Sequence, residues 1–230
     1  MPIIGVALKY NSLEDGRDIL YLGELVRRTF QKLGAFIITI VPVQDINYNS
    51  TKYNEFNELT EKEKDLIDKY LDMVDGVVFP GGFKVTPYDQ YLLERCIERD
   101  IPTLGICLGM QLLSNYKRDF KVELNESSIN HNYKDDDTRL AHKIKIKKDT
   151  LLYKILGQDE IFVNSYHKYH CLENDKVISN AYSEDGYIEG VEVSNKKFVL
   201  GVQWHPEISY GFDDNSKKIL DYFMEVCSND

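Results

Sequence analysis

The chain has 230 residues and a formal net charge of −10, and 43% of its residues are hydrophobic. This length suits one α/β domain with a substantial core, and the hydrophobic content excludes a disordered chain. The acidic balance argues against a general nucleic-acid-binding or anionic-membrane surface, because both need clustered Lys and Arg.

The cysteines and the termini indicate a cellular setting. Four cysteines, at positions 96, 107, 171 and 227, form no CxxC pair and show no regular spacing. This usage is typical of reduced thiols, so we expect a cytoplasmic protein. No signal peptide is evident, and no apolar run approaches membrane-spanning length, so we expect no membrane partner.

The first part of the chain alternates predicted strands and helices, which is typical of a parallel sheet with helices on both faces. Thr60 and Glu63 form a capping box at one helix start. Gly34 is a plausible end of the first helix. Apolar runs predict strands at 3–8, 35–41 and 76–79, helical spacing predicts helices at 22–33 and 60–71, and polar composition predicts loops at 10–18 and 45–58.

A glycine pair follows the third predicted strand. Gly81 and Gly82 allow main-chain N–H groups to turn inward, as one half of an oxyanion hole requires, and a plain tight turn is the alternative. Lys84 comes two residues later. Asp89 is predicted to cap the next helix, whose apolar face contains Leu92, Leu93, Cys96 and Ile97.

The central motif is the segment Gly105–Gly109, which joins an apolar strand-like run to a helix-like run. A cysteine between two glycines at such a turn resembles a nucleophile elbow. The turn is sharp and the helix passes close to the strands, so side chains at Gly105 and Gly109 would clash. A helix N-terminus also favours a thiolate at Cys107. A buried structural cysteine is the alternative.

The second part of the chain is rich in predicted strands. Residues 123–139 are predicted to form a polar loop over or near the site. Consecutive carboxylates at 135–137 do not converge on one ion, so we expect no metal there. Apolar runs and alternation predict strands at 141–147, 160–163, 178–182, 188–193 and 198–202, and Asp214 is predicted to cap a last helix with Ile219, Leu220 and Phe223 buried.

A base and an acid follow the last predicted strand. His205 and Glu207 lie two residues apart, with Pro206 between them. A thiol needs a base to become a nucleophile, and the base needs an orienting acid. A structural histidine is the alternative when this segment is considered alone.

Gly105–Gln111 together with Trp204–Glu207 resembles the class I glutamine amidotransferase superfamily, from about Ile3 to the end of the chain. The resemblance implies a flavodoxin-like α/β fold with a central, mostly parallel sheet and a small antiparallel section in the second half. It also implies one glutamine amidotransferase type 1 domain over residues 1–230. Residues 163–167 and 186–192 resemble the γ-glutamyl hydrolase branch (peptidase C26-like), which includes γ-glutamyl-γ-aminobutyrate hydrolases.

By this resemblance, Cys107 is the nucleophile, His205 the base and Glu207 its orienting acid, and no metal or organic cofactor is needed. The oxyanion hole would use the main-chain N–H groups of Gly82 and Leu108. His131 lies where relatives often place a histidine near the substrate. Lys84 and Lys168 depart from the family pattern. The implied substrate-binding residues are Gly81, Gln111, Asn164, Ser165, Tyr166 and His167.

Three functions follow as hypotheses. The first is a hydrolase that cleaves a small γ-glutamyl conjugate through a glutamyl thioester, with an amino acid, a polyamine, a folate polyglutamate tail or a nucleotide-linked amidate as leaving group. The second is the glutaminase subunit of a two-component amidotransferase. Only this second function requires a synthase partner. The third is a non-enzymatic binding module. The oligomeric state stays open, with a homodimer among the options.

Overall fold

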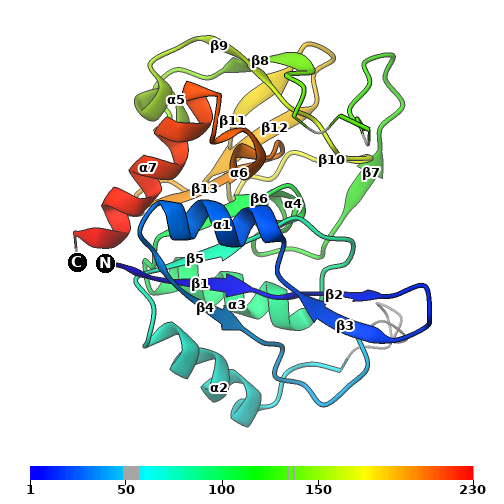
Figure 1. Ribbon diagram of the computed structural model, residues 1–230, viewed down its shortest axis with the longest axis vertical. Coiled ribbons are helices and arrows are strands. Elements are labelled where there is room, and N and C mark those ends of the chain that lie inside the picture. The colour runs from blue at the N-terminus through cyan, green and yellow to red at the C-terminus, as the bar shows by residue number, and fades with distance from the viewer. Residues whose placement is uncertain (49–56, 134, 137, 230) are drawn as a thin grey trace.

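The computed structural model describes residues 1–48, 57–133, 135–136 and 138–229. Within them, one 11-stranded sheet forms the centre and a two-stranded sheet lies beside it (Figure 1). The predicted loop at 45–58 falls largely outside these residues, as does part of the acidic run at 135–137. The described helices include none that is both long and apolar enough to span a bilayer.

The first part of the large sheet is parallel, and its strands lie in the order β4-β1-β5-β6-β13. This is the flavodoxin-like order, in which the chain reverses direction across the sheet between β1 and β5. The predicted α/β class is therefore confirmed. The bounds of these strands are β1 Ile3–Ala7, β4 Phe36–Ile40, β5 Gly76–Phe79, β6 Thr103–Ile106 and β13 Val199–Val202.

The second part of the sheet is antiparallel and continues from β13 through β12, β11, β8 and β9. A short strand, β10, pairs with both β12 and β7. The antiparallel section predicted for the second half is present. The bounds are β7 Val122–Leu124, β8 His142–Ile146, β9 Glu160–Val163, β10 Tyr169–Cys171, β11 Ile178–Ser183 and β12 Ile188–Glu192.

Helices cover both faces of the sheet, as the strand–helix alternation predicts (Figure 1). One hydrophobic core lies under α1, α5 and α7 and includes Phe30 and Phe223. The other lies under α2, α3 and α4 and includes Phe79 and Tyr88. The bounds are α1 Glu24–Lys32, α2 Glu61–Leu71, α3 Pro87–Glu98, α4 Leu108–Ser114, α5 Leu151–Leu156, α6 Pro206–Ser209 and α7 Asp214–Ser228.

The polar segment 10–18, predicted as a loop, belongs to a hairpin of β2 (Lys9–Ser12) and β3 (Asp18–Tyr21). That prediction is wrong because β2 is largely polar, and β3 is only four residues long with no alternation of apolar and polar residues. The turn signal is nevertheless present, since Gly16 has a φ of +83°. The hairpin places Tyr21 beside the pocket described below.

Two helix starts differ by a few residues from the prediction. The N-cap of α3 is Thr86, which forms a capping box with Asp89. The N-cap of α7 is Asp213, whose carboxylate accepts hydrogen bonds from the main chain. In each case an earlier polar side chain reaches the free N–H groups of the first turn, so the predicted caps Asp89 and Asp214 lie inside the helices.

The elements of the second half that escaped prediction include α5, β7 and β10. Helix α5 has only six residues, but Thr150 caps its start and Gly157 ends it in the left-handed conformation, and these two signals could have revealed it. The polar segment 123–139 contributes to β7, and the short β10 pairs with β7. Both strands have three residues, too few for a recognisable alternation.

Candidate active site

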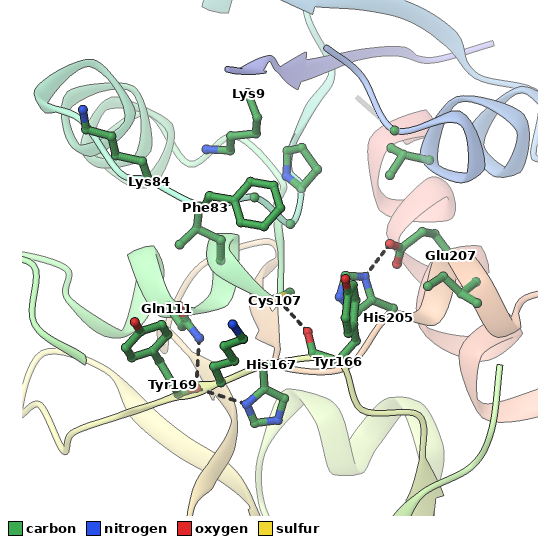
Figure 2. A pocket seen from close by; sticks show the side chains of 18 of the residues that line it. Lys9, Phe83, Lys84, Cys107, Gln111, Tyr166, His167, Tyr169, His205 and Glu207 are labelled. Atoms are coloured by element: carbon green, nitrogen blue, oxygen red, sulfur yellow. Dashed lines mark hydrogen bonds and ion pairs between the residues drawn. The ribbon is translucent and has the colours of Figure 1, made fainter. Parts of the chain in front are cut away.

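A pocket of about 760 Å³ opens where the parallel strands end (Figure 2). Lys9 follows β1, the Gly81–Gly82 pair follows β5, Cys107 follows β6, and His205 comes shortly after β13. The carboxyl ends of parallel strands meet at one edge of a sheet, and ligands bind there next to the point where the strand order reverses. The fold therefore gathers the predicted motifs at one place.

Cys107 occupies the sharp turn between β6 and α4. Its φ of +53° is a conformation that L-residues rarely adopt. The close approach predicted for the flanking glycines is present. A methyl group at Gly105 would lie 2.6 Å from the main-chain oxygen of Gly109, and one at Gly109 would lie 2.0 Å from the main-chain oxygen of Phe79. The glycines thus hold the elbow against the sheet.

His205 lies between Cys107 and Glu207 (Figure 2). Its Nδ1 atom is 2.7 Å from Oε1 of Glu207, in a buried pair. Burial alone would lower the pKa of His205, but the negative groups at Glu207 and Cys107 outweigh burial and raise it well above its usual value. Glu207 itself is held through its main-chain oxygen, which accepts a hydrogen bond of 3.0 Å from the Thr29 hydroxyl.

The glycine pair after β5 forms the wall opposite His205. A methyl group at Gly81 would lie 3.0 Å from Cε1 of His205 and 3.6 Å from Cβ of Cys107, so only a glycine leaves both side chains in place. Gly82 adjoins Leu108, whose side chain would lie 3.2 Å from such a methyl group. Both residues line the pocket. The main-chain N–H at the start of a helix, here that of Leu108, has no acceptor within the helix.

The predicted substrate-binding residues separate into two groups. Gly81, Gln111, Tyr166 and His167 line the pocket, whereas Asn164 and Ser165 do not. Asn164 and Ser165 are both buried, and they support the site from outside the pocket wall.

Asn164 holds the main chain of His205 on both sides. Its Oδ1 accepts from the N–H of His205 at 2.8 Å, and its Nδ2 donates to the oxygen of the same residue at 2.9 Å. The hydroxyl of Ser165 donates to the main-chain oxygen of His131 at 2.9 Å. Asn164 therefore positions His205 through the main chain of that residue.

The sequence leaves open whether His131, Lys84 and Lys168 contact the substrate, and the three residues lie in different surroundings. His131 is buried away from the pocket, while its neighbour Asn132 lines it. Lys84 and Lys168 both line the pocket, but the Lys84 ammonium donates to the main-chain oxygen of Tyr48 at 2.6 Å. Lys168 is exposed, and the described part of the chain shows no acceptor for its ammonium group.

Aromatic side chains that the sequence did not single out form much of the pocket wall. Phe83 is 77% exposed at the rim, and Tyr169 is half exposed. Burial and the neighbouring Cys107 raise the pKa of Tyr21, which comes from the unpredicted hairpin. The other residues of this wall include Phe120 and Val122.

Lys9 is buried under the glycine pair, with its ammonium 2.7 Å from Asp89. A methyl group at Gly82 would lie 3.1 Å from Cγ of Lys9, so this pair supports the wall of the pocket. The Asp89 carboxylate also accepts from the N–H and hydroxyl of Thr86. Removing only one partner of a buried ion pair destabilises the protein strongly, because the other charge stays buried without compensation.

We therefore expect Lys9→Met to lower the free energy of unfolding by about 3 kcal/mol or more. In the double variant Lys9→Met/Asp89→Asn, the second change removes the uncompensated charge and keeps an acceptor for Thr86. Part of the lost free energy of unfolding should therefore be recovered. Urea unfolding measures both effects. Lys117→Met, which breaks a surface pair with Glu98, is the control and should change stability little. A double variant no more stable than Lys9→Met would contradict this account.

The arrangement has the parts that acyl transfer needs. The thiol of Cys107 at a strained turn, the imidazole of His205 and the carboxylate of Glu207 lie next to one another, and Gly82 and Leu108 line the same pocket. Such a set can form and hydrolyse a thioester without a metal. The one group of described side chains with metal-ligand geometry lies beneath the pocket.

Comparisons with known proteins agree with this geometry. The family model described as peptidase C26 matches residues 88–207. A glutamine amidotransferase-like protein of Rickettsia prowazekii is 31% identical over 63% of this chain and 74% of its own length. The glutamine amidotransferase-like protein YvdE of Lactococcus lactis is 28% identical over 97% of this chain and 98% of its own.

A solved structure with the same fold is the glutaminase domain of a Trypanosoma brucei CTPS with bound acivicin. The match has a TM-score of 0.67 and covers 99% of this chain and 94% of that one, at 16% identity. At this identity the likeness concerns the fold alone.

Proposed function

Because the chain belongs to the peptidase C26 family, among the glutamine amidotransferase-like C–N hydrolases, we propose that it hydrolyses the γ-glutamyl amide bond of a small conjugate. We further propose that residues 1–230 act as one catalytic domain. The observation that carries the proposal is the buried His205–Glu207 pair placed beside Cys107 in a pocket of about 760 Å³.

The reaction begins at Cys107. Its thiolate attacks the δ-carbonyl carbon of the γ-glutamyl group, and the resulting oxyanion accepts hydrogen bonds from the N–H groups of Gly82 and Leu108. His205, oriented by Glu207, protonates the departing amine as the C–N bond breaks. A glutamyl thioester remains on the sulfur.

Water completes the cycle. His205, now neutral, removes a proton from a water molecule that attacks the thioester carbonyl. The C–S bond breaks, glutamate leaves, and the proton on His205 restores the starting ion pair with Cys107. The raised pKa of His205 supports an imidazolium that is paired with the Cys107 thiolate before the attack, as the first step requires.

The size and lining of the pocket favour a conjugate over free glutamine. Its volume lies within the range of about 300–1,000 Å³ that is usual for drug-sized ligands. Phe83, Phe120 and Tyr169 provide apolar surface, and Lys168 provides a cation at the rim. These features suit an amine with a planar or apolar part and an anionic group.

Glutamate release by the purified chain tests the proposal. Glutamine is compared with γ-glutamyl amines that carry apolar, aromatic, cationic or anionic groups, and Cys107→Ala is the control. We expect rapid hydrolysis of one class, with glutamine a poor substrate. Lys168→Ala should raise KM for the anionic amines without affecting the neutral ones.

The alternative is a glutaminase subunit that supplies ammonia to a synthase. Sequence similarity to the CTP synthase of Sulfolobus acidocaldarius, 32% identical over 64% of this chain and 33% of its own length, favours this candidate. Weak Cys107-dependent activity on every amide, glutamine included, would overturn the conjugate hydrolase and support the alternative. A synthase partner would then be expected to raise glutamine hydrolysis.

A further inference from the structure

Four buried ligand-type side chains converge beneath the floor of the pocket. His131, His142, His167 and Glu189 come from distant parts of the chain, and none is more than 5% exposed. Their nitrogen and carboxylate oxygen atoms all lie within 4.8 Å of one another. Cys107, His205 and Glu207 are not part of this cluster.

The nitrogen and oxygen atoms that face one another within the cluster lack hydrogen-bond partners. They are Nδ1 of His131, Nε2 of His142, Nε2 of His167 and both carboxylate oxygens of Glu189. The three nitrogens lie 3.4, 3.8 and 3.5 Å from the same oxygen, Oε1 of Glu189. Buried polar groups are rarely left unpaired, because each costs about 1–3 kcal/mol.

The opposite nitrogen of each ring has a defined acceptor. Nε2 of His131 lies 2.9 Å from the Asp185 carboxylate. Nδ1 of His142 lies 3.4 Å from the main-chain oxygen of Lys143, and Nδ1 of His167 lies 3.1 Å from that of Tyr169.

Carboxylate and carbonyl oxygens only accept hydrogen bonds, so the ring nitrogens that face them carry the protons. In the neutral rings, the three inward nitrogens then present lone pairs to a carboxylate oxygen. A cation is needed among them, either as protons on the rings or as a metal ion.

We propose that His131, His142, His167 and Glu189 bind one Zn²⁺ ion in a tetrahedral site. Zinc takes nitrogen and carboxylate oxygen ligands at about 2.0–2.2 Å, which in a tetrahedron places neighbouring ligand atoms about 3.3–3.6 Å apart. The three nitrogen–oxygen distances of 3.4 to 3.8 Å match this spacing better than they match hydrogen bonds.

The surroundings fit the charge of a divalent ion. Glu189 and Asp185 together carry two negative charges, and the three neutral rings carry none. A carboxylate or carbonyl oxygen behind each histidine is the usual second layer of a zinc site, where it fixes the ring and its tautomer. Asp185 is fixed in turn by the Ser183 hydroxyl.

The site would hold the segment 164–169 in place. His167 lines the pocket and belongs to the cluster as well. In the same segment, Asn164 binds the main chain of His205, and the oxygen of Tyr169 accepts from Gln111. The ion is therefore structural, and its presence does not depend on the proposed reaction.

Metal content tests this inference directly. The full chain is purified without a histidine tag in the Cys107→Ala background, which removes the thiol as a second place for zinc. It is dialysed against Zn²⁺ and then against metal-free buffer, and elemental analysis counts the ions. We expect about one zinc per chain, falling below about a tenth in Glu189→Gln and His142→Ala.

The fifth histidine provides a matched control. His170 lies outside the cluster and stacks on Tyr187, so His170→Ala should keep its zinc. Asp185→Asn should bind zinc about 10- to 100-fold more weakly, since it removes only the second layer. With Co²⁺ in place of Zn²⁺, we expect the intense visible bands of tetrahedral cobalt, and Glu189→Gln should abolish them.

Thermal unfolding tests the inference on a chain whose cluster is intact, so the result does not depend on whether the cluster variants fold. Adding Zn²⁺ to the chelator-treated Cys107→Ala chain should raise Tm by roughly 10 °C at saturating metal. The inference is overturned if this chain retains no zinc and shows no such shift, in which case protonated rings neutralise Glu189. Equal zinc loss in His170→Ala and His142→Ala would overturn it too.

Discussion

Replacing Cys107 by alanine is expected to reduce kcat for γ-glutamyl amide hydrolysis roughly 10⁶-fold, with the fold intact. Loss of the nucleophile in a catalytic triad has an effect of this size, because the remaining groups can only bind and polarise the substrate. The change removes one sulfur atom from a small side chain, so the free energy of unfolding should change little. Single-turnover glutamate release and urea unfolding measure the two quantities.

The same variant tests the link between Cys107 and His205. The negative charge at Cys107 is one of the causes that raise the pKa of His205. In Cys107→Ala we therefore expect a lower pKa for His205, still raised by Glu207. An NMR titration of the ring measures it. An unchanged pKa would mean that the thiol and the imidazole do not form an ion pair.

Cys96→Ala is the matched control for activity. Burial raises the pKa of the Cys96 thiol to about 12, so it stays protonated at neutral pH. We expect this variant to keep wild-type turnover, while iodoacetamide inactivates it through Cys107. Wild-type activity in Cys107→Ala would refute the assignment of the nucleophile.

Replacing Gly109 by alanine is expected to lower the free energy of unfolding by at least about 3 kcal/mol. The added methyl group would lie 2.0 Å from the main-chain oxygen of Phe79 and 2.8 Å from its carbonyl carbon. Main-chain atoms in a central strand cannot turn aside as a flexible side chain does. Helix α4 must then move away from β5 and take Cys107 with it. Urea unfolding measures the loss.

Gly211→Ala provides the comparison. A methyl group there meets no atom within 4 Å, and the residue does not need a positive φ. Its free energy of unfolding should stay within about 0.5 kcal/mol of the wild type. If Gly109→Ala is as stable as Gly211→Ala, the helix is not packed against the strand as described.

The fold and the two halves of the site could be predicted because their signals are local. Cys107 lies between two glycines, and His205 and Glu207 are two residues apart, so each motif is complete within a short segment. The parallel strands are continuous apolar runs, and their carboxyl ends meet at one edge.

The cluster beneath the pocket could not be predicted, since its four side chains belong to four separate segments. The sequence suggests no metal, because His131, His142, His167 and Glu189 show none of the short spacings of a metal motif. The pairing of β8 and β12 with β11 brings His142 near Glu189, and a main-chain hydrogen bond joins His167 to His131. Asn164 is a similar case, since its role depends on a contact with His205, 41 residues away.

The position of β13 has a consequence for the newly made chain. This strand fills the place between β6 and β12, and His205 follows Cys107 by 98 residues. At translation rates of about 5–20 residues per second, Cys107 leaves the ribosome roughly 5–20 s before His205. During that interval β6 lacks a neighbour, and its open edge can pair with other strands. The last described strand therefore completes the sheet, and under the proposed function it also brings the base to the thiol, so we expect an incomplete chain to be inactive.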